Sequence, residues 1–265
     1  VSSKLITETA QSGQEVHCED LAGNKIGVAC TTDSTGKCKV TGLTEAQVTA
    51  GVVVVSGDGT KTPIVHAYEQ PETATITAAK SGTAIPSTIS TETDVAYAVI
   101  KQTASDEAGG SLDKVKDKFD PRCLRDAMKA MTGDDSASTS DLGGYMEGMF
   151  QAHASAMAKA PVSGGTAPAD LMKDALAGKP EGMVGIVGKE VSKVPVADAA
   201  TNFGKVIKQI KEAYCKKADA SSKPQWEEIK DKAEKNSAGS FDPKAMCNLF
   251  KGFKPTEIGE YKPEY

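Results

Sequence analysis

The sequence predicts an α+β protein in which an N-terminal antiparallel β-sandwich precedes a disulfide-tied α-helical domain. Three observations predict this fold. Short runs rich in Val, Ile and Thr, separated by turn residues, fill the first 70 residues. Beyond residue 91 the apolar residues recur with a period near 3.6, and every methionine lies beyond residue 120. The six cysteines divide evenly between the two parts of the chain.

Strands are expected throughout the first part, because each apolar run is of strand length and ends at residues that favour turns. Turn signals occur at Gly23-Asn24, at Asp33 to Gly36 and at Gly57-Asp58-Gly59. Short strands at this spacing are typical of an antiparallel sandwich. The expected strands cover residues 4–9, 14–20, 25–33, 36–43, 48–57 and 61–69.

The rest of the chain is expected to form roughly six to eight helices. Asp120-Pro121 and Asp242-Pro243 each place an N-cap acid before a proline at the first helical position. Thr91, Ser140 and Ser222 are further N-cap candidates. Two apolar stripes with the helical period consist of Leu142, Met146, Met149, Phe150, His153 and Met157, and of Phe203, Val206, Ile207, Ile210 and Tyr214.

The domain boundary is expected in the segment 70–90, which is rich in Thr, Ala, Ser and Pro. This segment is either a last strand followed by a linker or a loop that docks on both domains. The predicted organisation is a β-sandwich over residues 1–80, a linker over 81–90 and an α-helical domain over 91–265.

Composition and charge argue against two classes of protein. The chain has no run of 18 or more apolar residues, so no membrane span is expected. Lys and Arg total 31 against 36 Asp and Glu, and Arg122 and Arg125 are the two arginines. Proteins that bind nucleic acid usually present a basic, Arg-rich face, so no nucleic-acid partner is expected. The first residue is Val1, which fits a mature protein whose signal peptide has been removed, or a trimmed chain.

Cys30 and Cys38 flank a polar turn, which is compatible with a metal site, a redox motif or a stapled hairpin. A turn that ends in a left-handed Gly36 places the two cysteines near each other on one face of the hairpin. The redox motif requires C-x-x-C at the start of a helix, and this spacing does not match it. His17 and Cys18 are consecutive on a strand and point to opposite faces, which disfavours a zinc site. We therefore expect a stapled hairpin.

The cysteine count predicts a disulfide between the two domains. The cysteines are Cys18, Cys30 and Cys38 in the first domain and Cys123, Cys215 and Cys247 in the second. Since three is odd, oxidation of all six requires at least one interdomain bridge. We expect one such bridge together with one pair within the first three. Disulfides persist in oxidising compartments, so a secreted or cell-surface location is expected. The alternative is a reduced protein with buried thiols.

The stretch "VHCEDLAGNKIGVACTTDSTGKCKVTGL" resembles the prealbumin-like sandwich family that includes carboxypeptidase regulatory-like domains. The shared pattern is a strand, a turn at Asp20 to Gly23, a Val-containing strand, the "TTDSTGK" hairpin and a Gly42-Leu43 exit, and it covers about residues 12–68. The later stretch "AIPSTISTETDVAYAV" looks like the link between such domains and helical regions in bacterial secreted and surface proteins. The resemblance implies a prealbumin- or immunoglobulin-like sandwich, in a family whose members are mostly non-catalytic modules for folding, adhesion or surface assembly.

Other candidate sites are better explained as structural residues. Asp33 and Asp58 could bind Ca²⁺, but their loops lack the dense acidic spacing that supplies six to eight oxygens. The segment 181–190 resembles a phosphate loop, yet Met183 stands where the first glycine should be. His153 lies on an apolar helix stripe, where a core histidine is more common than a catalyst. We therefore expect no catalytic residue, no cofactor and no metal.

These patterns predict a secreted or cell-surface structural protein that acts by self-assembly, as a filament or surface-layer subunit, or by adhesion. The alternative is a periplasmic or extracellular protein whose helical domain binds a small ligand or a glycan. An enzyme ranks third, since the sequence contains no assembled catalytic set.

Self-assembly is expected to use an extended terminal segment that adds to a sheet edge or groove of a neighbour. The segments are residues 1–9, "VSSKLITET", and residues 254–265, "KPTEIGEYKPEY". Head-to-tail contacts of this kind produce filaments unless their rotation closes a ring. The alternative is that both segments are frayed tails, or that residues 4–9 pair within their own sandwich. The candidate assembly residues are Lys4, Leu5, Ile6, Ile258, Tyr261 and Tyr265.

Overall fold

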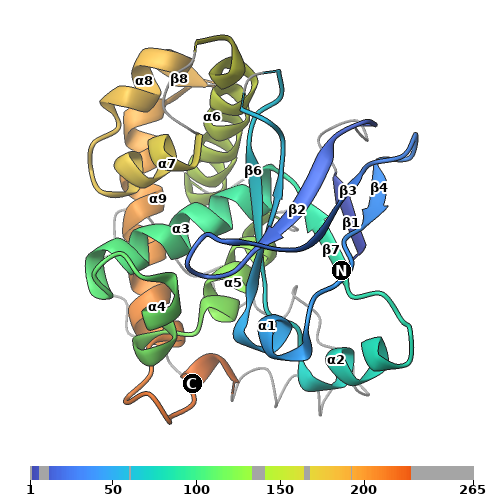
Figure 1. Ribbon diagram of the computed structural model, residues 1–265. Coiled ribbons are helices and arrows are strands. Elements are labelled where there is room, and N and C mark those ends of the chain that lie inside the picture. The colour runs from blue at the N-terminus through green and yellow to red at the C-terminus, as the bar shows by residue number, and fades with distance from the viewer. Residues whose placement is uncertain are drawn as a thin grey trace. The chain divides into compact units, whose positions relative to one another are not determined.

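The computed structural model is an α+β chain that divides into two compact units (Figure 1). The N-terminal unit comprises Val1–Tyr97 with Met157–Ala169, and the helical unit comprises Ala98–Ala156 with Asp170–Tyr265. The structure describes residues 2–5, 12–59, 61–132, 141–163, 168–191 and 193–227.

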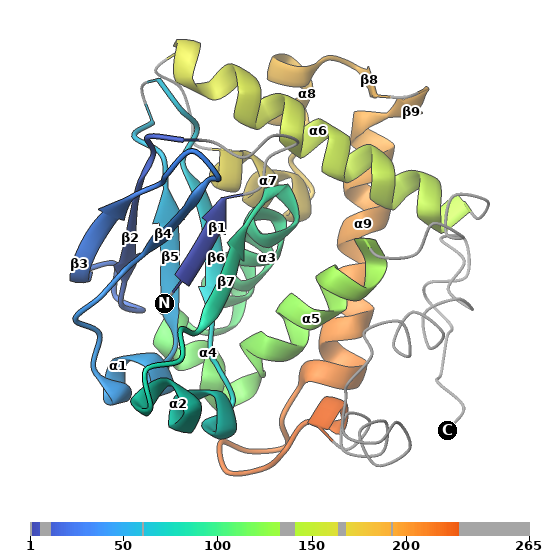
Figure 2. The ribbon, with the colours of Figure 1, turned by 90° about the vertical axis from the view of Figure 1, so that its right-hand side faces the viewer.

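Two sheets and two short helices make up most of the N-terminal unit. Its elements are β1 (Ser2–Leu5), β2 (Glu15–Glu19), β3 (Lys25–Thr31), β4 (Lys37–Lys39), α1 (Glu45–Ala50), β5 (Val52–Ser56), β6 (Val65–Glu69), α2 (Thr73–Lys80) and β7 (Pro86–Ile89). The larger sheet is antiparallel, with the order β3-β2-β5-β6, and the smaller sheet has the order β4-β1-β7. Strand β1 pairs antiparallel with β4 and parallel with β7, which runs beside it in Figure 2.

The core of this unit lies between the two sheets. Pairing aligns Cys18 with Val54 and Val54 with Ala67, and cross-strand partners share one face of a sheet. These side chains form a buried cluster with Ile89 of β7 and with Val40, which follows β4. Strand β5 is buried at every residue, and this two-sided burial explains its unbroken run of four valines.

The prealbumin-like sandwich is not confirmed. The larger sheet has only four strands, the smaller sheet mixes parallel and antiparallel pairs, and α1 and α2 interrupt the expected succession of strands. The coarser prediction, an α+β chain with an antiparallel sheet and disulfides, is confirmed.

Helix α1 occupies the start of the strand that was expected over residues 48–57. The Gln47 N–H donates to Thr44 Oγ1, and the Thr44 N–H donates to Gln47 Oε1, which together form a capping box. Strand β5 begins only at Val52, after Gly51 has ended the helix with a φ of 99°. The capping box therefore decides where the strand can begin.

The segment expected to be a linker carries regular structure. Helix α2 precedes it, and β7 lies within residues 81–90 and pairs with β1. The chain passes from one unit to the other later, between Tyr97 and Ala98 within helix α3 (Thr91–Glu107). No local pattern signals the β1–β7 pairing, because its partners lie more than 80 residues apart in sequence.

The stapled hairpin between β3 and β4 is confirmed. Cys30 and Cys38 form a disulfide, and Gly36 has the expected left-handed φ of 72°. The Asp33 N–H donates to the Lys37 carbonyl at 2.9 Å, and Asp33 Oδ1 accepts from the Thr35 hydroxyl and from the Thr35 and Lys37 N–H groups. Those donors, the Thr35 hydroxyl first, hold the pKa of the Asp33 carboxyl below its usual value.

The helical unit buries the apolar stripe that the sequence predicts over residues 203–214, together with Met149 and His153 of the other predicted stripe. Its complete elements are α4 (Leu112–Lys118), α5 (Pro121–Thr132), α8 (Glu181–Val187), β8 (Glu190–Val191), β9 (Val194–Pro195), α9 (Val196–Ile210) and the short π-helix η2 (Lys211–Cys215). Three helices belong to it in part: α3 after Tyr97, α6 (Asp141–Ser163) up to Ala156, and α7 (Pro168–Leu176) from Asp170. His153 of α6 and Phe203 of α9 are fully buried. Within the described residues, no helix is both long and apolar enough to cross a membrane.

A second disulfide ties the start of α5 to the end of α9 and η2. Cys123 and Cys215 are bonded across 92 residues of sequence, and the Asp120 N–H donates to the Cys215 carbonyl at 2.9 Å. Asp120 also caps α5 as predicted, since its Oδ1 accepts from the Arg122 N–H at 2.9 Å. The other predicted N-cap acid, Asp242, lies outside the described residues.

Cys18 departs from the expectation that all six cysteines are oxidised. Among the described residues it is the one cysteine outside a disulfide, and it is fully buried in the core. Burial raises the pKa of its thiol to about 11. Cys247 lies outside the described residues. Because the other four cysteines are paired within their own units, the expected interdomain disulfide could only join Cys18 to Cys247, and the free Cys18 thiol does not support it.

We expect native Cys18 to resist alkylation by iodoacetamide at pH 8. A pKa of about 11 leaves only about one thiol in a thousand as the reactive thiolate at that pH, and the sulfur is shielded from solvent. Labelling before and after unfolding in urea, followed by non-reducing peptide mapping, measures this. Rapid labelling of the native chain, or a peptide that links Cys18 to Cys247, would contradict the buried free thiol.

Candidate functional site

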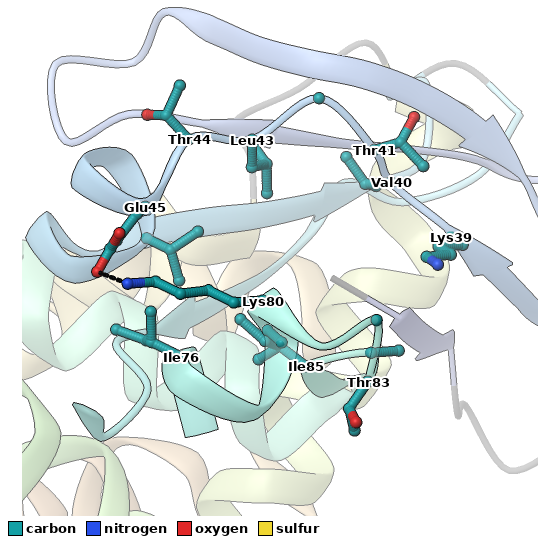
Figure 3. A pocket seen from close by; sticks show the side chains of 15 residues that line it. Lys39, Val40, Thr41, Leu43, Thr44, Glu45, Ile76, Lys80, Thr83 and Ile85 are labelled. Atoms are coloured by element: carbon teal, nitrogen blue, oxygen red, sulfur yellow. Dashed lines mark ion pairs between the residues drawn. The ribbon is translucent and has the colours of Figure 1, made fainter. Parts of the chain in front are cut away.

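The candidate site is an open groove of about 340 Å³ in the N-terminal unit, which we call the α1–α2 groove (Figure 3). It lies between the residues that follow β4, the two short helices and the segment that leads into β7. Its walls are formed by residues 39–45, Val48, Ile76, residues 79–80 and residues 82–85.

The floor of the groove is apolar. Val48 of α1, Ile76 of α2 and Ile85 form one small buried cluster, against which Leu43 and Ala79 pack while remaining partly exposed. Val48 and Ile76 are the single buried residues of their helices, so each short helix is held mainly by this contact. A floor of this composition favours an apolar side chain in the groove.

The rim of the groove is charged. Lys80 Nζ lies 2.8 Å from Glu45 Oε1, and the two side chains are 57% and 58% exposed. Figure 3 shows this ion pair at one end of the groove and Lys39 at the other. Within the described part of the chain Lys39 makes no ion pair, so one positive charge at the rim is available to an incoming carboxylate.

The groove continues the line of strand β1. The register places Ser2 opposite Lys39 on one side and opposite Pro86 on the other. The groove is lined by the residues that follow Lys39 and by those that precede Pro86. Because neighbouring strands are about 4.8 Å apart, two strands separated by a third leave a slot about 9.6 Å wide. Strand β1 fills this slot over Ser2–Leu5, and the α1–α2 groove is the part beyond Ser2.

The N-terminal segment does not extend freely from its unit. Lys4 and Leu5 belong to β1, which is hydrogen-bonded on both sides within its own unit. This corrects the expectation of a segment that is available to a neighbour, and it matches the alternative in which this segment pairs within its own unit. The remaining candidate assembly residues, Ile6, Ile258, Tyr261 and Tyr265, lie outside the described residues.

A buried polar cluster that the sequence did not predict joins β6 to α3. Asp94 is fully buried, and it accepts from the His66 N–H at 2.7 Å, while the His66 ring Nδ1 lies 2.8 Å from the same carboxylate oxygen. The Tyr97 ring stacks on the His66 ring at 4.4 Å between centroids. Asp94 lies in the first turn of α3, where the helix dipole favours a carboxylate.

This cluster has a structural role. The Asp94 carboxylate accepts from an outward-facing backbone N–H on β6, the edge strand of its sheet. Within the described residues no hydroxyl or thiol is hydrogen-bonded to His66. The spacing of 28 residues between His66 and Asp94 gives no local signal for this contact.

Across the described part of the chain, no three His, Cys, Asp or Glu side chains gather to hold a metal ion. The Asp58 carboxylate accepts from the N–H groups of Lys61 and Thr62, as Asp33 does in its own turn. Both residues therefore act in turns, which is the role that the sequence favours over Ca²⁺ binding.

The helical unit has a cavity of about 380 Å³ among α3, the end of α7 and α9. Some of its polar groups pair with one another: Gln102 Nε2 donates to Asp106 at 2.7 Å, and Lys211 lies 3.6 Å from Glu107. The Gln102 Oε1 atom, by contrast, is buried and has no hydrogen-bond partner among the described residues. A small-ligand site in the helical unit, the alternative function, stays a prediction.

Comparison of the chain with protein-family models, with curated proteins and with solved structures finds no match. The resemblance to carboxypeptidase regulatory-like domains therefore rests on the turn-and-strand pattern alone.

We expect the substitution Lys80→Ala to lower the free energy of unfolding by less than about 1 kcal/mol, because an ion pair this exposed contributes little. Ile76→Ala, which removes a buried floor side chain, should cost about 2–5 kcal/mol. Urea denaturation followed by circular dichroism measures both. An equal decrease in the free energy of unfolding for the two variants would contradict the division of the groove into an apolar floor and a weakly held rim.

Proposed function

We propose that this protein is a secreted or cell-surface structural protein that assembles with copies of itself by exchanging strand β1. The disulfides Cys30–Cys38 and Cys123–Cys215 support an oxidising location, since such bonds are rare in reducing compartments. The resemblance to prealbumin-like modules supports a non-catalytic role in assembly or adhesion. The observation that carries the proposal is the place of β1 in the middle of the smaller sheet.

Strand β1 is the main-chain link between β4 and β7. Among the described strands these two do not pair with each other, so the smaller sheet depends on whatever strand lies in the slot. The same strand from a second copy would make the same hydrogen bonds. Exchange therefore costs no sheet hydrogen bonds, which is why swapping of identical elements is a low-cost route to assembly.

The connection from β1 to β2 is long enough for exchange. It covers residues 6–14, of which Gly13 and Gln14 are hydrogen-bonded to Thr32 within the unit. The seven residues before them span at most about 25 Å when fully extended. Reciprocal exchange between two copies would close a dimer. Exchange from each copy to the next would give an open filament, because head-to-tail contacts do not close unless their rotation allows it.

Cysteine cross-linking between two variants tests the exchange. Lys4 is aligned with Thr88, which is exposed, so a cysteine at each position can form a disulfide without disturbing the core. We expect a mixture of Lys4→Cys and Thr88→Cys proteins, incubated at high concentration, to form a disulfide-linked dimer. Peptide mapping should place the new bond between positions 4 and 88.

The matched control replaces Thr88→Cys with Lys61→Cys, an exposed position in the same unit that is not aligned with β1. The double variant Lys4→Cys/Thr88→Cys should form a disulfide within one chain at high dilution, which verifies the register. Strand exchange is excluded if this intramolecular disulfide forms, but the mixture of Lys4→Cys and Thr88→Cys proteins forms a disulfide-linked dimer no faster than the mixture of Lys4→Cys and Lys61→Cys proteins at every concentration.

A further inference from the structure

The α1–α2 groove offers a place for an extended segment. It is open, it has an apolar floor, and its walls continue those on either side of β1, which are as far apart as two strands with a third between them. We propose that this groove binds residues 254–265 of the chain, from the same copy or from a second one. The proposal is separate from strand exchange, because the groove lies beyond Ser2 whichever copy supplies β1.

The sequence of the segment "KPTEIGEYKPEY" suits an extended, one-strand site. Pro255 and Pro263 oppose helix, because proline lacks an N–H and fixes its own φ. Pro255, Ile258 and Tyr261 recur at every third position, which is the period of a polyproline II helix and would place them on one side. Rigid side chains such as Tyr and Ile lose little conformational freedom on binding, so this side suits the apolar floor.

The glutamates near the middle of the segment complement the lysines of the rim. Glu257 and Glu260 lie on either side of Ile258, the two lysines of the segment lie toward its ends, and the groove presents Lys39 at one end and Lys80 at the other. Lys39 makes no ion pair within the described residues, so it can accept a carboxylate without breaking a contact. Lys80 would exchange Glu45 for an incoming glutamate at little cost, since its present pair is more than half exposed.

The chain is long enough to deliver the segment. Residues 228–253 separate it from Glu227, the last described residue, and they span up to roughly 90 Å when extended. A compact chain of this length has an expected radius of gyration of about 18 Å. Length therefore permits binding within one copy, which would cover the groove, and binding between copies, which would add a second contact to the assembly.

A labelled peptide tests the proposal on the full chain. The peptide has the sequence of residues 254–265 with an N-terminal fluorophore, and the protein carries Ile258→Asp and Tyr261→Asp so that its own segment cannot compete. We expect saturable binding by fluorescence polarisation, weaker at high ionic strength. A peptide of the same composition in scrambled order should not bind.

Charge-reversed variants locate the site. On the same background, the double substitution Lys39→Glu/Lys80→Glu should weaken binding by about tenfold or more, since two attractive contacts become repulsive. The matched control Lys61→Glu reverses an exposed charge of the same unit outside the groove, and it should change the affinity less than about twofold. Circular dichroism verifies that the variants fold alike.

The wild-type chain distinguishes the two sources of the segment. If the segment binds within its own copy, the peptide should bind wild type more weakly than the Ile258→Asp/Tyr261→Asp protein at every protein concentration. If it binds between copies, the wild type should form larger species in sedimentation that the double variant does not form. Two results would overturn the proposal. One is that the peptide shows no saturable binding to the Ile258→Asp/Tyr261→Asp protein, and the other is that Lys39→Glu/Lys80→Glu and Lys61→Glu lower the peptide affinity equally. Neither result would affect the strand-exchange test.

Discussion

The N-terminal unit depends on the main-chain pairing of one short strand. β4 and β7 reach each other only through Ser2–Leu5, because neither pairs directly with the other among the described strands. The buried cluster between the two sheets draws Ile89 from β7 and Val40 from the end of β4. Loss of β1 would therefore remove the hydrogen bonds that hold these apolar residues in place, so a strand of four residues controls the core between two sheets. The same slot, continued beyond Ser2, becomes the α1–α2 groove.

Other constraints fix the elements around this slot. The Cys30–Cys38 disulfide staples the hairpin that supplies β4, and the turn at Asp33 fixes its register. On the other side, Asp94 joins the first turn of α3 to β6 by accepting from the His66 backbone and from its ring. Buried carboxylates are tolerated only when donors satisfy them, and this one has both a backbone donor and an imidazole. These contacts hold the elements on both sides of the slot in place.

The features that the sequence predicts well are those with local causes. The hairpin needs only the side chain of Asp33 and a glycine at position 36, and helix α5 needs only Asp120 before a proline. Helix α1 also has a local signal in the Thr44–Gln47 capping box, but the strand expected over residues 48–57 followed from the valine run alone. The β1–β7 pairing and the Asp94–His66 contact join residues far apart in sequence, and no pattern within either segment specifies its partner. The groove was missed for the same reason, since its walls come from two stretches far apart in sequence, residues 39–48 and 76–85.

Both proposals depend on what can occupy a strand-wide space. In them, a strand from a second copy would fill the slot, and a proline-bounded segment with three glutamates and two lysines would fill the groove. Both proposals use main-chain geometry and a few side chains rather than a catalytic constellation, as expected of an assembly module.

Hydrogen–deuterium exchange of the full-length chain, read at the amides of residues 3–5, tests the central claim most directly. A strand that is hydrogen-bonded on both sides directs each N–H to one neighbour or the other, so these amides should exchange at least about a hundredfold more slowly than an unstructured chain. Exchange at the unstructured rate in residues 3–5, while β2 and β5 remain protected, would contradict the account.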